Sequence, residues 1–180
     1  MELPLTISNN HGEKITFLRI ATNTSGEQIL ELENEVTPKA GPPMHVHYKQ
    51  DECLTVTEGR MGYQVFGSEK KYAGPGETVL FKAGVAHKFW NDGTELLRCT
   101  GWATPPNSII YFLSEIYKST HENGGRPGAF DAAYLLNRYK SEYDMLEIPV
   151  FVKNVIFPVT LFFGKLQGKH KKFANAPMPV

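Results

Sequence analysis

The sequence has few cysteines, no excess of charge of either sign and no long apolar run at its start. Among 180 residues only Cys53 and Cys99 are cysteines, and their spacing excludes a CxxC metal or redox motif. We therefore expect both thiols to be free. The first residues lack the basic start and apolar run of a signal peptide, so a reducing, cytoplasmic location is the expectation.

Positive and negative side chains balance, since Lys+Arg and Asp+Glu both total 19. A neutral chain without a basic stripe is not expected to bind nucleic acid, because phosphate groups are neutralised by clustered cations. The balance is uneven along the chain: residues 148–180 contain five lysines and no acid. With 41% hydrophobic and 12% aromatic residues, the chain can build a packed core, which excludes intrinsic disorder.

The first hundred residues have the pattern of short strands. Apolar and polar residues alternate, as in Lys14–Ile20, and turn-forming residues such as Gly74-Pro75-Gly76 separate the segments. The candidate strands are 14–20, 28–33, 54–57, 61–66, 77–81, 86–90 and 96–102. Many short strands at close spacing predict an all-β fold: a sandwich, a jelly roll or a barrel.

After Trp102 the pattern becomes helical. Apolar residues recur at helical spacing in residues 109–117, within a helix expected from about Asn107 to Lys118, and again in 132–143. A third apolar segment, 148–163, is shorter than the about 20 residues of a membrane span and is interrupted by charge and proline. The sequence thus predicts a β domain over residues 1–104 and a helical extension over residues 105–180 that packs on it.

Three of the six histidines lie in two short clusters. His45 and His47 are two residues apart, so on an extended strand they project from the same face. Glu52 opens the next candidate strand, and the loop before it can return the chain beside this pair. His87 starts another candidate strand after a glycine turn.

These clusters resemble the two motifs of the cupin superfamily. The first motif, G-x5-H-x-H-x3,4-E-x6-G, is matched by Gly41, His45, His47, Glu52 and Gly59. Its first glycine stands closer to the histidine pair than the pattern requires.

The second motif, G-x5-P-x-G-x2-H-x3-N, is matched by Gly76, Gly84, His87 and Asn91, with Lys82 at the proline position. The resemblance covers residues 28–103 and is to small, single-domain, quercetinase-like cupins. It implies a single cupin jelly-roll β-barrel with C-terminal α-helices, and a homodimer paired through its strands.

The resemblance also implies a metal site formed by His45, His47, Glu52 and His87. Three imidazoles and a carboxylate inside a barrel need a partner, and one divalent ion satisfies all four. Mixed nitrogen and oxygen ligands suit Zn, Fe, Mn, Ni or Cu without ranking them. We therefore expect one divalent transition metal per chain, with open positions for a small-molecule ligand or substrate.

Two classes of function fit this site. One is a metal-dependent oxidoreductase of the dioxygenase type, in which Glu52 is also the catalytic candidate, as a general base. The other is a non-catalytic or sensory protein that binds a small acid or enol through the same ion, and isomerases and decarboxylases also use this ligand set. Fold alone does not choose between them.

The basic tail has two interpretations. Its lysines and apolar residues are compatible with a helix on an anionic membrane surface. The favoured alternative is a helix that closes one barrel mouth or a dimer interface, so no membrane association is expected. For Phe89, ordinary core packing is favoured over a place in the wall of a substrate pocket, and Cys53 is expected to point away from the site.

Overall fold

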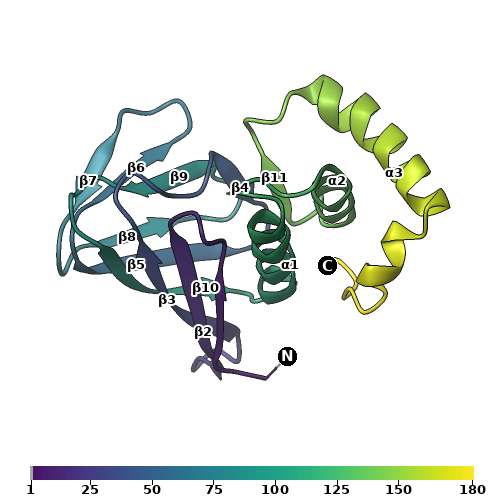
Figure 1. The fold of residues 1–180 in the computed structure, drawn as a ribbon. Coiled ribbons are helices and arrows are strands. Elements are labelled where there is room, and N and C mark those ends of the chain that lie inside the picture. The colour runs from purple at the N-terminus through teal and green to yellow at the C-terminus, as the bar shows by residue number, and fades with distance from the viewer. Residues whose placement is uncertain (1) are drawn as a thin grey trace.

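In the computed structural model, which describes residues 2–180, two antiparallel sheets face each other and the helices lie beside them (Figure 1). The first sheet has the strand order β1-β2-β3-β10-β5-β8 and the second has the order β11-β4-β9-β6-β7. The strands are β1 (Leu5–Ser8), β2 (Glu13–Thr22), β3 (Gln28–Val36), β4 (His45–His47), β5 (Asp51–Glu58), β6 (Met61–Val65), β7 (Lys71–Ala73), β8 (Thr78–Phe81), β9 (His87–Asn91), β10 (Leu97–Thr104) and β11 (Tyr143–Met145).

The core lies between the two sheets because each strand turns its apolar face inward. In β3 and β5 the buried positions alternate over much of their length, and Leu30 and Leu54 are completely buried. Phe81 of β8 meets Tyr63 of β6 edge-on across the interior, with ring centroids 6.1 Å apart. This is the jelly-roll arrangement of antiparallel sheets that the sequence predicts.

The helices α1 (Ile109–Glu122), α2 (Ala129–Arg138) and α3 (Phe157–Leu166) follow the strands. A π-helical stretch, η1 (Val152–Ile156), runs directly into α3, and a 3₁₀ turn, η2 (Lys169–Phe173), follows it. α1 packs against α2 and β1, and α2 packs against α3. In Figure 1 α3 lies on the far side of α2 from the strands.

Two local predictions for the extension were wrong. Tyr143 does not continue the second helix but lies in β11, which pairs with β4 and adds a strand to the second sheet. Pro158 does not divide the third segment, because the helix continues across it, with the π-helical turn η1 directly before α3.

Candidate metal centre

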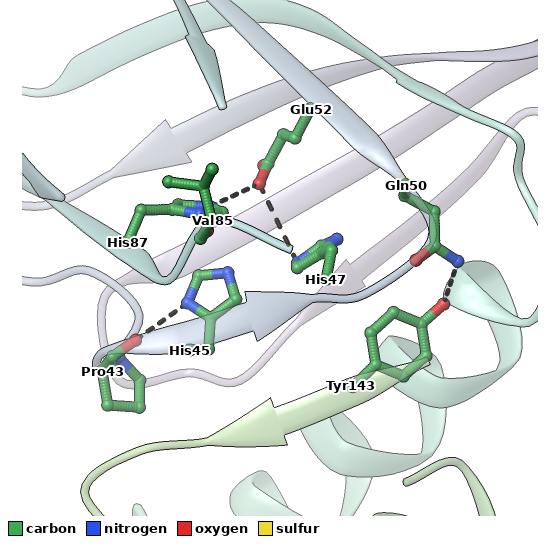
Figure 2. A network of polar contacts seen from close by, with 8 residues as sticks. All are labelled: Pro43, His45, His47, Gln50, Glu52, Val85, His87 and Tyr143. Atoms are coloured by element: carbon green, nitrogen blue, oxygen red, sulfur yellow. Dashed lines mark hydrogen bonds and ion pairs between the residues drawn. The ribbon is translucent and has the colours of Figure 1, made fainter. Parts of the chain in front are cut away.

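Strand pairing brings the predicted ligands together. His45 of β4 is the direct cross-strand partner of His87 in β9, so their side chains share the inner face of the second sheet. Glu52 of β5 pairs with Phe81 in the first sheet and faces them from the opposite side. The ligand atoms of the four predicted residues His45, His47, Glu52 and His87 all lie within 4.8 Å of one another (Figure 2).

The site is almost enclosed. His47, Glu52 and His87 are buried, with His87 only 1% exposed, whereas His45 is half-buried. Phe81 stacks flat on the His87 ring at 3.9 Å. Since His45 is the one member of the group that is not fully buried, the approach to the group is on its side.

Two of the imidazoles are oriented by backbone carbonyls. The Nδ1–H of His45 donates to the carbonyl oxygen of Pro43 at 2.9 Å, and the Nδ1–H of His87 donates to that of Val85 at 2.8 Å. These bonds place a proton on Nδ1 of each ring and turn Nε2 toward the site, where Nε2 of His87 lies within hydrogen-bond distance of Oε2 of Glu52.

The site has the electrostatics of a cation site. Burial, aided by the neighbouring imidazoles, lowers the pKa of His45 to about 3, and burial also lowers the pKa of His47. Burial alone would raise the pKa of Glu52, but the bond to His87 and the attraction of the histidines outweigh it and lower the pKa to about 2. At neutral pH the Glu52 carboxylate therefore faces uncharged imidazoles at His45 and His47, which do not compensate its negative charge.

The short distances fit an ion among the four side chains. The Nε2 atoms of His87 and His47 lie 3.1 Å and 3.9 Å from Oε2 of Glu52. A nitrogen and a carboxylate oxygen this close attract each other only when a proton or a cation lies between them. One divalent ion supplies that charge, so this group is suited to a single metal ion.

Sequence reasoning missed two residues beside the site, Gln50 and Tyr143. The Tyr143 ring meets His47 edge-on at 5.4 Å, and its hydroxyl accepts a 2.9 Å hydrogen bond from Nε2 of Gln50. Within residues 2–180, Nδ1 of His47 and Oε1 of Gln50 are buried without a hydrogen-bond partner. Figure 2 shows the Gln50 amide oxygen turned toward the His47 ring. Neither residue lies in a motif, so only the tertiary structure identifies them.

Lys82, which stands where the second motif has a proline, holds its turn in place through Asp51. Nζ of Lys82 binds Oδ2 of Asp51 at 2.7 Å, and the backbone N–H of Ala83 donates to Oδ1 of Asp51 at 2.8 Å. Asp51 directly precedes Glu52, so the turn that lacks the motif's proline is tied to the strand that carries the carboxylate ligand.

Other motif residues have structural roles. Asn91 is 1% exposed and donates to the carbonyl oxygens of Val36 and Glu95, both at 2.7 Å. A Cβ on Gly41 would collide with the backbone of Phe89, so β9 can approach only a glycine there. Phe89 itself belongs to the buried core.

The cysteines are free and buried. Burial raises the pKa of Cys99 to about 12, and burial together with the nearby Glu52 carboxylate raises the pKa of Cys53. A neutral thiol is a poor nucleophile, so the structure gives neither side chain the character of a catalytic cysteine.

Residues 33–102 match the model of the cupin domain family. The chain resembles the probable oxidoreductase virH of Hypocrea virens, with 34% identity over 68 residues, 37% of this chain and 31% of that protein. It also resembles the oxidoreductase iacF of Pestalotiopsis fici, with 36% identity over 67 residues, 36% of this chain and 33% of that protein. The chain therefore spans about a third of the length of these curated relatives.

Solved structures of similar shape include KdgF from a Halomonas species, with a TM-score of 0.47, 15% identity and coverage of 55% of this chain and 84% of that one. A protein with a double-stranded β-helix domain from Klebsiella pneumoniae has a TM-score of 0.47 and 18% identity, with coverage of 54% and 81%. No helix of residues 2–180 has the length and apolar character required to cross a bilayer.

Proposed function

We propose that this chain, whose residues 33–102 match the cupin domain family, is a metal-dependent oxidoreductase of the dioxygenase type that acts on a small organic molecule. The observation that carries the proposal is the convergence of three imidazoles and one carboxylate within 4.8 Å. The names of the two fungal relatives support an oxidoreductase over the isomerase, decarboxylase and ligand-binding alternatives.

In this proposal His45, His47, Glu52 and His87 hold one divalent metal ion. The bound ion supplies Lewis acidity, which polarises a coordinated oxygen and makes a nearby proton easier to remove. The chain keeps two of the rings, those of His45 and His87, in the correct tautomer through backbone carbonyls, so their geometry is set before the ion arrives.

We propose that Glu52 removes the proton of an enol or hydroxyl group on the substrate. Its Oε2 lies 3.1 Å from Nε2 of His87 and 3.9 Å from Nε2 of His47, and Glu52 is only 9% exposed, so little bulk water competes for this position. Although burial alone would raise its pKa, the hydrogen bond with His87 and the nearby imidazoles lower its pKa to about 2, so it is ionised at neutral pH. The substrate would enter past His45, the half-buried member of the group.

We further propose that the enzyme is of the quercetinase-like type, that its two sheets close into a barrel over residues 1–104, and that it is a cytoplasmic homodimer paired through strands. A barrel closed around the site would exclude water from reactive intermediates. Strands β1 and β8 end the first sheet and strands β11 and β7 end the second, so these four are the edges at which strands could pair.

The test measures metal content first and turnover second. Elemental analysis of the purified protein should give close to one divalent metal per chain, and the double variant His45→Ala/His47→Ala should carry none. Forms loaded with Fe, Mn, Ni or Cu are then assayed for oxygen consumption with flavonols and β-diketones. A protein that takes up no metal even after reconstitution contradicts the site, whereas a loaded protein that binds a small acid tightly without turnover assigns it to ligand binding.

A further inference from the structure

The helix that begins before η1 and ends with α3 exposes an apolar stripe, which we call the outer face. It consists of Phe151, Val155, Val159, Phe162 and Leu166, which are 63%, 43%, 51%, 61% and 71% exposed. The spacings of four, four, three and four residues place them on one side of the helix. The π-helical turn of η1 lies within this run.

The opposite side of this helix is fixed to the rest of the protein. Leu161 is buried, and Gly164 lies so close to the Phe130 ring of α2 that a Cβ there would collide with it. The helix therefore cannot turn its outer face inward without losing this packing. A helix that is apolar on both sides normally has a second apolar neighbour, and within residues 2–180 the outer face has none.

Unpaired positive charge lies at one end of the outer face. Lys165, Lys169 and Lys171 are exposed and form no ion pair with residues 2–180. In contrast, the other two lysines of the tail bind carboxylates elsewhere: Lys153 binds Asp144 and Lys172 binds Asp131. Lys165 also lines a cavity of about 350 Å³ beside α2.

We propose that the outer face lies in the interfacial layer of an anionic membrane, with Lys165, Lys169 and Lys171 beside lipid phosphates. The combination of an exposed apolar stripe with cations and no acid in residues 148–180 complements such a surface. The helix lies beyond α2 (Figure 1), so the strands do not prevent it from lying flat. A rise of about 1.5 Å per residue makes it about 25 Å long, too short to span a hydrocarbon layer of about 30 Å.

A second copy of the chain fits this face less well. If two outer faces packed against each other, their lysines would meet a segment, residues 148–180, that has no carboxylate to pair with them. The sequence alone favoured a packing helix here, and the exposure of the outer face is what now favours lipid.

Flotation of the full chain with vesicles tests the proposal. The protein should bind phosphatidylcholine vesicles that contain about 30% phosphatidylserine, and binding should fall when salt screens the charges. Each lysine at such a surface strengthens binding about fivefold, so Lys169→Gln/Lys171→Gln should weaken it about 25-fold. Phe162→Gln/Leu166→Gln should abolish binding to these vesicles at any salt concentration.

Two variants on the jelly roll serve as matched controls. Phe66→Gln removes an aromatic ring that is 66% exposed, and Lys71→Gln removes an exposed lysine of β7; both should bind as the unaltered chain does. Circular dichroism checks that every variant is folded. The proposal is overturned if the unaltered chain does not bind the vesicles that contain phosphatidylserine. It is also overturned if sedimentation shows a dimer that Phe162→Gln/Leu166→Gln dissociates while vesicle binding is absent, because the face then belongs to a second copy.

Discussion

The side-chain amide of Gln50 donates a 2.9 Å hydrogen bond to the hydroxyl of Tyr143, and this bond joins the helical extension to the metal centre. Gln50 is 1% exposed and Tyr143 is 4% exposed. Burial raises the pKa of Tyr143 well above its usual range, so the hydroxyl stays neutral and keeps this bond. The bond holds the amide so that its oxygen is turned toward His47 (Figure 2).

Replacing Gln50 with leucine should weaken metal binding. His45 and His87 each donate Nδ1–H to a backbone carbonyl, and the Gln50 oxygen is the acceptor available to His47, directly or through a water molecule. Loss of such an orienting partner costs about 10- to 100-fold in metal affinity. Competition with a chromophoric chelator measures this change.

The matched control is Gln64→Leu, because Gln64 binds the Ser68 carbonyl at an exposed position. Equal metal affinity in Gln50→Leu and the unaltered chain would show that Gln50 does not orient His47. A drop in affinity together with a large loss of folding stability in the metal-free state would assign Gln50 a structural role instead.

Much of the site could be predicted from the sequence because the ligands lie in short motifs, whose spacing along the chain sets their geometry. The two-residue spacing of His45 and His47 sets a shared face through the period of a strand, and the order of ligands and glycines resembles a known family. The contribution of Tyr143 could not be predicted, since it depends on β11 pairing with β4 over a separation of about a hundred residues. Tyr143 lies four residues after Tyr139, a spacing that predicts a continued helix, whereas the residue lies in a strand.

The contrast between local patterns and long-range contacts also explains which features of the helical extension could be predicted. The amphipathic pattern of residues 109–117 predicts α1, and the chain does form a helix there. The exposure of Phe151 and Phe162 could not be predicted, because a sequence records that a residue is apolar but not what covers it.

Replacing Glu52 with glutamine should separate binding from catalysis. The amide keeps the volume of the side chain and one oxygen ligand but removes the charge and the proton acceptor. We expect weaker metal binding and, in protein saturated with metal, a fall in kcat of about 100- to 10,000-fold. Turnover is compared at matched metal occupancy, over a range of pH. A loaded Glu52→Gln enzyme with unaltered kcat would contradict the role of general base.

Replacing Asn91 with alanine should destabilise the fold without changing the metal site. Its side chain donates to the carbonyl oxygens of Val36 and Glu95 and accepts from the N–H of Gly93 at 2.8 Å. Losing a buried set of three bonds costs about 2–4 kcal/mol. Urea unfolding of the metal-free protein measures the cost, and Asn154→Ala on the exposed helix is the control. A change in metal affinity larger than about twofold would place Asn91 among the groups that shape the site.

Lowering the pH should destabilise the metal-free protein even above the pH range in which carboxylates ordinarily titrate. Burial holds the pKa of His45 at about 3 and also lowers that of His47, whereas an unfolded imidazole titrates near 6.5. Below about pH 6.5 the unfolded chain therefore binds more protons than the folded chain, and stability falls as the pH drops toward 3. Glu52, whose folded pKa of about 2 lies below its usual 4.5, adds a further loss below about pH 4.5.

Urea unfolding of chelator-treated protein between pH 7.5 and 4 measures this dependence. The variant His45→Gln/His47→Gln lacks both buried imidazoles, so its stability should change much less between pH 6.5 and 4.5. Protons and the metal compete for the same Nε2 lone pairs, so the loaded protein should release its ion over the same interval. If the unaltered chain and the double variant lose stability in parallel, the acid response originates elsewhere, and the buried imidazoles are not the groups that the folded state keeps neutral.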